Sequence, residues 1–83
     1  MITEKQVSEI LGNELPEINN ELKKLSGSNN IYKTINCFVY LTKEYIIKGK
    51  FIAVKHCFSL AEKMLEEGNN TVKNAIENVY VYS

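Results

Sequence analysis

Residues 31–48 read IYKTINCFVYLTKEYIIK, and they place apolar side chains on nearly every side of a helix. A helix that is apolar around most of its circumference has to be covered on most sides. We therefore expect this segment to be the central helix of an all-α fold. Its apolar residues are Ile31, Tyr32, Ile35, Cys37, Phe38, Val39, Tyr40, Leu41, Tyr45, Ile46 and Ile47.

The flanking sequence supplies the helices that would cover this segment. Apolar residues recur there at spacings of three and four, the period of one helical face. Thr3 followed by Gln6 has the form of a capping box, and Gly49 and Gly68 suit the ends of two helices. We predict one domain over residues 1–83, a small bundle of four to five helices. The expected helices span about residues 3–11, 14–25, 30–48, 50–67 and 70–81.

Local signals suggest how these helices begin, end and pack. Gly12 is expected to end or kink the first helix, and Pro16 falls in the first turn of the second, where its missing N–H is no loss. The β-branched and aromatic run at residues 79–82 leaves a terminal strand as an alternative. A lone strand has nothing to pair with, so we favour a helix there. The residues of the fourth helix expected to point inward are Phe51, Val54, Phe58, Ala61, Met64 and Leu65.

Residues 35–68 resemble one tetratricopeptide repeat. The resemblance rests on the offsets of Phe38, Leu41, Thr42, Tyr45, Gly49, Phe51, Val54, Phe58 and Ala61, of which Thr42 and Val54 are larger than the 34-residue pattern prefers. It implies an antiparallel helical hairpin with aromatic side chains between its helices. It does not extend by one period in either direction. The closing run over residues 68–82 also resembles small bacterial helical domains of unknown function.

Composition argues against several classes of partner. Every cation is Lys, every anion is Glu, and the formal net charge is zero. Nucleic-acid binding relies on Arg and on a basic surface, so we expect none. No apolar stretch approaches the ~20 residues that cross a bilayer, so we expect no membrane association and a cytoplasmic location. The richness in Lys, Asn, Ile and Tyr is typical of an AT-rich genome and suggests a bacterium.

The sequence also lacks a recognisable catalytic or metal site. His56 is the only histidine, and with Cys37 and Cys57 it forms no known metal-ligand spacing, so we expect neither metal nor cofactor. His56 and Cys57 are adjacent and point about 100° apart on a helix, which is unsuitable for a nucleophilic pair. We interpret both cysteines as reduced packing residues. Neighbouring carboxylates such as Glu66 and Glu67 lie on a predicted solvent face, and we expect no enzymatic activity.

Two groups of residues are candidates for partner binding. Asn36, Val39, Lys43, Ile46 and Ile47 match the positions that line the concave binding face in the tetratricopeptide resemblance; the alternative is that the first or last helix covers them. The second group, Tyr80 and Tyr82 with Val81 between them, adds apolar bulk at the C-terminus and either meets a partner or packs back on the core. An exposed apolar patch of this kind marks an interface.

The sequence therefore predicts a small, non-catalytic protein–protein interaction module that binds a protein or peptide and that could form a homodimer. One alternative is an immunity protein or antitoxin-type inhibitor of a partner toxin, for which Glu14, Glu17 and Glu21 supply a thin acidic face. A structural homodimer is a second alternative.

Overall fold

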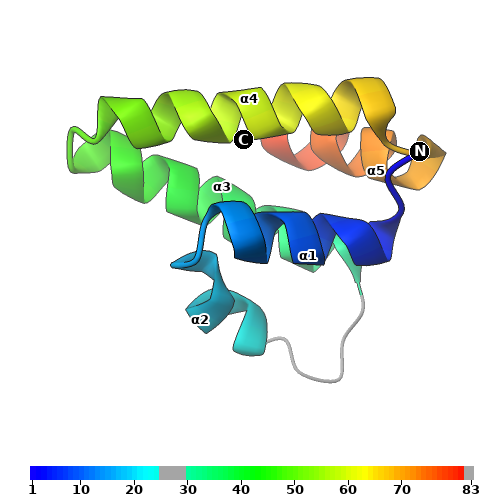
Figure 1. Cartoon of the computed structure of the whole chain (residues 1–83), viewed down its shortest axis with the longest axis horizontal. Helices are drawn as coiled ribbons and strands as arrows, with labels where there is room; N and C mark the ends of the chain where they lie inside the picture. The colour runs from blue at the N-terminus through cyan, green and yellow to red at the C-terminus, as the bar shows by residue number, and fades with distance from the viewer. Residues whose placement is uncertain (25–29, 82–83) are drawn as a thin grey trace.

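The computed structural model describes residues 1–24 and 30–81, which form an all-α bundle as predicted. No residue in these two ranges belongs to a β-strand. Helices α3 and α4 form an antiparallel hairpin, with α1 and α2 on one side of it and α5 on another (Figure 1). The elements are α1 (Glu4–Glu14), α2 (Ile18–Lys23), α3 (Ile31–Ile47), α4 (Phe51–Glu67), α5 (Asn70–Ala75) and the π-helix η1 (Ile76–Val81).

Helix α3 is the centre of the bundle. It packs against α1, α2, α4, α5 and η1, which explains why its sequence is apolar on so many sides. The fully buried side chains around it come from every other element as well. They are Val7, Leu11, Ile18, Ile35, Phe38, Cys57, Met64, Val72 and Ile76.

Side-chain caps are present at the N-termini of α1, α3 and α5. The predicted capping box is confirmed at α1, where the Thr3 N–H donates to Gln6 Oε1 at 3.0 Å and the Gln6 N–H donates to Thr3 Oγ1 at 3.4 Å. The Asn30 side chain accepts from the N–H of Tyr32 at 2.8 Å and begins α3. These caps satisfy backbone donors that have no partner inside the helix.

The break between α1 and α2 lies later than the sequence suggests. Helix α1 continues through Gly12 to Glu14, and α2 begins only at Ile18. The cause is Pro16, which lacks an N–H and disfavours helical geometry at the preceding residue. Leu15 accordingly has φ −130° and ψ 76° and closes α1 by donating its N–H to the Leu11 carbonyl at 2.8 Å. Leu25, the last residue of the predicted second helix, lies outside the described residues.

Gly49 makes the turn of the hairpin possible. Its φ of +70° is the left-handed conformation that glycine adopts easily. The Gly49 N–H donates to the Ile46 carbonyl at 3.1 Å, and the Lys50 N–H donates to the Tyr45 carbonyl at 2.9 Å. This pair of bonds is the Schellman motif, which ends α3 and starts α4 within a few residues.

The sequence predicts that Phe51 and Phe58 of α4 point inward, but in the structure both are exposed. The buried side of α4 is formed by Val54, Cys57, Leu60, Ala61 and Met64, whereas Phe51 and Phe58 are exposed. Phe51 and Phe58 are seven residues apart and share a flank of α4. At Phe51, the hairpin end extends beyond α1 and α5, so no helix remains to cover that flank (Figure 1).

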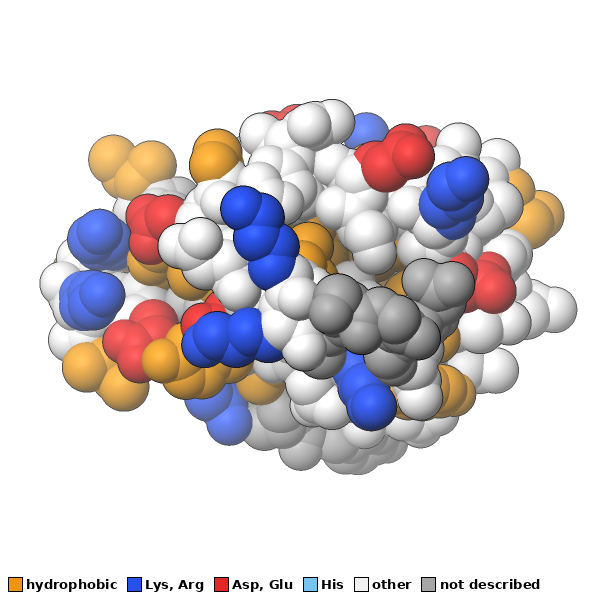
Figure 2. Space-filling view, turned by 90° about the horizontal axis from the view of Figure 1, so that it is seen from below, with side chains coloured by type: hydrophobic (Ala, Val, Ile, Leu, Met, Phe, Trp, Pro, Cys, Tyr) orange, Lys and Arg blue, Asp and Glu red, His pale blue; other side chains and the backbone are white. Residues whose placement is uncertain are grey.

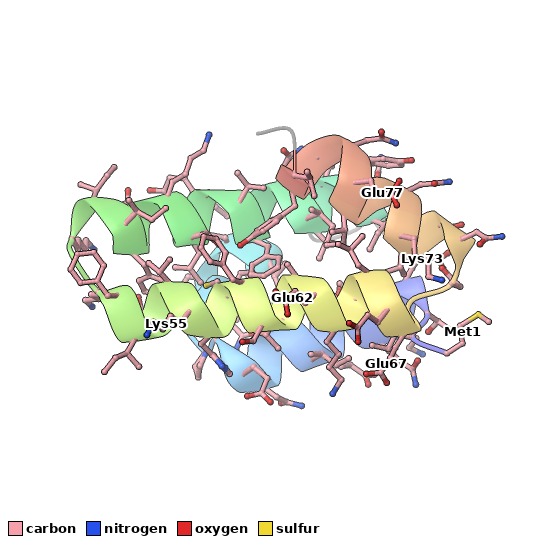
Figure 3. The ribbon with its side chains drawn as sticks, turned by 90° about the horizontal axis from the view of Figure 1, so that it is seen from above. Met1, Lys55, Glu62, Glu67, Lys73 and Glu77 are labelled. Carbon is pink, nitrogen blue, oxygen red and sulfur yellow. The ribbon has the colours of Figure 1, made fainter. Side chains whose placement is uncertain are left out.

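The first residues of the chain join the far end of α4. The Ile2 N–H donates to the Glu67 carbonyl at 2.7 Å, and the Asn69 N–H donates to the Ile2 carbonyl at 2.8 Å. Ile2 and Gly68 thereby form an isolated parallel bridge, and the Ile2 side chain enters the core. Figure 3 shows Met1 beside Glu67 at this end of the molecule.

The predicted last helix consists of two parts. After α5, residues 76–81 form the wider turns of a π-helix, so a helix rather than a strand occupies this segment. The Tyr80 ring stacks on Phe38 with a centroid distance of 4.6 Å. Its hydroxyl lies 3.2 Å from Thr42 Oγ1, which itself donates to the Phe38 carbonyl at 2.9 Å.

Candidate functional site

The most prominent surface feature is the exposed apolar end of the α3–α4 hairpin. We define the hairpin tip as residues 46–52, in which Lys48, Gly49 and Lys50 separate two apolar pairs. Ile46 and Ile47 come from the end of α3 and are 51% and 80% exposed. Phe51 and Ile52 begin α4 and are 71% and 88% exposed. Four large apolar side chains thus lie in solvent within seven residues, which makes the hairpin tip a candidate interaction surface.

A groove of about 680 Å³ lies beside the hairpin tip, between the α3–α4 turn and the α1–α2 connection. Polar residues stand around it, among them Glu14, Lys50 and His56. A largely apolar groove with a few polar groups is the usual form of a binding site. Its apolar lining is Leu15, Pro16, Tyr45, Phe51, Ile52 and Ala53.

The polar groups of this groove contact one another. His56 Nε2 lies 3.3 Å from Glu14 Oε2, which joins α4 to the end of α1 across the groove. The Lys50 ammonium stands 5.8 Å from the centre of the Tyr45 ring. Burial raises the pKa of Tyr45, and the nearby Glu17 carboxylate raises it further. Tyr45 therefore stays protonated and serves as part of the groove wall.

The residues predicted from the sequence to bind a partner divide between surface and core. Asn36, Lys43, Ile46 and Ile47 are exposed on α3, and the two isoleucines belong to the hairpin tip. Val39 is part of the hydrophobic core, because α3 is enclosed by its neighbours at that level. Val39 therefore cannot line an open surface, and its placement on the binding face is wrong.

The C-terminal candidates also separate. Tyr80 is half-buried and packs back on the core through Phe38 and Thr42. Val81 is exposed, and Tyr82 lies outside the described residues. Burial raises the pKa of the Tyr80 hydroxyl, although its hydrogen bond with Thr42 lowers it in part. Tyr80 thus anchors η1 to α3 in this structure.

Neither cysteine has the surroundings of a reactive thiol. Both are free; Cys57 is buried and Cys37 is half-buried. Burial is the main cause that raises the pKa of each thiol, so both favour the protonated form. His56 is exposed and faces Glu14, on a different side of α4 from Cys57.

The rest of the described surface offers no comparable candidate for a metal site, a membrane-spanning helix or a ligand pocket. Across residues 1–24 and 30–81, no three His, Cys, Asp or Glu side chains lie close enough together to hold a metal ion. Among the helices described, none is both long and apolar enough to cross a bilayer. A hollow of about 630 Å³ between α1 and α3 is lined by Thr3, Glu4, Lys5, Ser8, Glu9, Ile31 and Thr34, and its mixed charges favour no ligand.

Sequence reasoning overlooked half of the hairpin tip. Phe51 was assigned to the core, and Ile52 was not assigned to any face. The signal that could have revealed them is local: two apolar pairs flank a Lys-Gly-Lys turn in residues 46–52. The first residues of α4 are covered by α3 on one side, where Val54 is buried, whereas Phe51 and Ile52 are exposed.

Comparison with known proteins identifies a family. A family model described as Domain of unknown function (DUF7674) matches residues 8–83. No tetratricopeptide family model matches, whereas the resemblance to small helical domains of unknown function is confirmed. No curated protein and no solved structure matches the chain.

Proposed function

The chain belongs to the DUF7674 family of domains, and from the surface of this member we propose that it is a non-catalytic protein–protein interaction module that binds through the hairpin tip. The observation that carries the proposal is the exposure of Ile47, Phe51 and Ile52 next to an apolar groove. Fully burying one such side chain contributes about 1.5–3 kcal/mol. Covering three of them would provide much of the free energy of a stable complex.

The shape of the tip also supports binding rather than catalysis. The polar residues at the groove, Glu14, His56 and Lys50, engage one another or an aromatic ring. All three side chains are exposed, whereas a catalytic acid, base or nucleophile is typically held in a cleft. The apolar residues Leu15, Pro16 and Ala53 instead form a wall that an apolar side chain of a partner could contact.

The alternative of an inhibitor with an acidic face has weaker support. Of its three carboxylates, Glu14 pairs with His56 and Glu21 lies 3.5 Å from the Lys24 ammonium. Glu17 stands near the Tyr45 hydroxyl. The three side chains therefore contribute to local contacts, which favours the interaction module over an acidic inhibitor.

The proposal is tested by affinity capture from a lysate of the organism that encodes the chain. Wild-type bait is compared by quantitative mass spectrometry with an Ile47→Ser/Ile52→Ser bait. We expect the double variant to retain partners at least about tenfold less well, equivalent to ~1.4 kcal/mol.

The matched control is Glu62→Gln, an exposed position on α4 away from the tip (Figure 3). All three baits should show the same urea midpoint, because none of the substitutions touches the core. Equal retention of the same proteins by all three baits would contradict the proposal, and so would a complete absence of specific partners.

A further inference from the structure

Charge is distributed unevenly along this electrically neutral chain. Residues 43–56 contain four of the ten lysines and one of the ten glutamates, so this segment carries three net positive charges and the remainder three net negative ones. Lys43, Lys48, Lys50 and Lys55 are all exposed. The one glutamate, Glu44, is half-buried and hydrogen-bonds the Tyr40 hydroxyl, which raises the pKa of that tyrosine.

The positive charges surround the exposed apolar side chains. Seen from below, orange hydrophobic and blue lysine side chains gather at the left end of the molecule, where the hairpin turn lies, with some carboxylates among them (Figure 2). Figure 3 shows Lys55 near that end of α4, while Glu62 and Glu67 follow toward the opposite end. Lys48 and Lys50 directly adjoin Ile47 and Phe51 in the chain, and charges on an exposed surface act over a screening length of ~8 Å in a physiological buffer.

We infer that the occupant of the hairpin tip is an amphipathic helical segment of another protein whose polar face is acidic; this inference rests on the proposed function. The apolar face of the helix would cover Ile47, Phe51 and Ile52 and place a side chain in the groove. Its carboxylates would lie against Lys48, Lys50 and Lys55. Helices bind grooves in this way through anchors at i, i+3, i+4 and i+7.

Two other occupants fit less well. A second copy would bring its own positive segment against this one, and like charges opposed across an interface are unfavourable. An anionic bilayer would meet the Glu14 carboxylate at the groove and Glu17 near Tyr45, and a flat surface would leave the groove unfilled. A bound helix, by contrast, can place its acidic residues only on the side that faces Lys48, Lys50 and Lys55, and so keep them away from Glu14 and Glu17.

The test uses two designed fluorescent peptides of about 18 residues, roughly five helical turns. One has a leucine face and glutamate elsewhere, and the other replaces every glutamate by lysine. We expect fluorescence anisotropy with the full chain to show at least about tenfold tighter binding of the acidic peptide. Added NaCl should weaken that binding, because exposed charges are screened.

Variants assign the preference to the tip. Lys48→Gln/Lys50→Gln/Lys55→Gln should remove most of the preference for the acidic peptide. The matched control Lys5→Gln/Lys33→Gln/Lys63→Gln removes the same charge from exposed positions outside residues 43–56 and should retain it. Equal loss in both variants would overturn the inference, because only overall charge would then matter.

The remaining outcomes separate this inference from the proposed function. Equal affinity for both peptides, abolished by Ile47→Ser/Ile52→Ser, would overturn the acidic partner and leave the interaction module standing. Binding of neither peptide would overturn the inference, and the capture experiment would then decide the proposed function independently. Tip-dependent binding to vesicles of phosphatidylserine and phosphatidylcholine without peptide binding would assign the tip to a lipid surface instead. Self-association measured by light scattering would assign it to a second copy.

Discussion

Gly68 is required by close packing rather than by an unusual backbone conformation. Its φ of −72° and ψ of 156° are open to any residue. A Cβ at this position would lie 2.6 Å from Val72 Cγ1 and would also collide with the Met64 carbonyl oxygen. Gly49 presents the opposite case, because its φ is +70° and the space around its Cα is empty. Gly68 is therefore required for steric reasons, and Gly49 is required for its backbone conformation.

Gly68→Ala is expected to lower the free energy of unfolding by about 1–3 kcal/mol, since the new methyl group overpacks a site bounded by backbone. Urea denaturation followed by circular dichroism measures this loss. Gly49→Ala is the comparison, with an expected loss of about 1 kcal/mol from left-handed geometry alone. A wild-type midpoint for Gly68→Ala would show that the α4–α5 junction can relax, contrary to the packing seen here.

Glu4 gives the stability of the fold a dependence on acid. Its Oε1 accepts from Asn69 Nδ2 at 2.7 Å, and this hydrogen bond is the main cause that lowers the pKa of the Glu4 carboxyl below its ordinary value. A depressed pKa in the folded state means that the stabilisation is present above the unfolded pKa and disappears as the pH falls through the folded pKa.

We therefore expect wild type to be more stable than Glu4→Gln at pH 7 and the difference to be smaller at pH 3, because acid protonates the Glu4 carboxylate. Urea midpoints of both proteins at the two pH values measure this. Glu9→Gln, at an exposed position on the same helix, serves as the control. A stability difference between wild type and Glu4→Gln that stayed constant with pH would show that the charge of Glu4 is irrelevant to the contact with Asn69.

At the scale of elements, η1 packs against α3, α4 and α5, and its contacts with α3 include a polar and an aromatic contact of Tyr80. The Tyr80 ring stacks on Phe38 at an interplanar angle of 26°, and the Tyr80 hydroxyl meets Thr42 Oγ1. A π-helix is rare and usually short, because its wider turns pack less well than those of an α-helix. The contacts with α3 are the compensation visible in this structure.

A double-mutant cycle of Thr42→Val and Tyr80→Phe isolates the hydrogen bond between these side chains. Each substitution keeps the shape of the side chain, so the stack on Phe38 should remain. We expect a coupling energy of about 0.5–1.5 kcal/mol, the usual net contribution of a hydrogen bond. Additive losses in urea unfolding would mean that the two hydroxyls contribute independently.

The sequence predicts the central elements well because their evidence is periodic and local. The apolar pattern of residues 31–48 predicts a buried helix, and Thr3 with Gln6 predicts a capping box. Both predictions are confirmed. Periodicity cannot indicate where neighbouring helices stop, so it predicts Phe51 in the core, although the hairpin end extends beyond α1 and α5 there. Phe58 shares the flank of Phe51 and is 49% exposed. Val39 was misplaced for the converse reason, because a surface assignment requires knowing which helix lies opposite.

At the scale of the whole molecule, the contacts of the N-terminal residues and the proposed binding surface lie at opposite ends of the hairpin. At the end away from the turn, Ile2 and Gly68 join residues 1–3 to α4 and α5. At the turn, Ile47, Phe51 and Ile52 are exposed, while the core around Phe38 stays buried. Substitutions at the tip should consequently leave the fold intact, which is the condition on which the binding experiments depend.

The N-terminal residues that precede the family match belong to the structural core. The match begins at residue 8, yet Val7 is fully buried and Ile2 nearly so. Burying each of these side chains contributes about 1.5–3 kcal/mol, against a total stability of about 5–15 kcal/mol for a domain.

A chain that starts at Ser8 also loses the capping box and both backbone hydrogen bonds of Ile2. We expect it to unfold at much lower urea concentration or without cooperativity, as measured by circular dichroism, whereas removal of the exposed Met1 alone should have no effect. A chain from Ser8 that unfolded like the full chain would show that residues 1–7 do not stabilise the bundle.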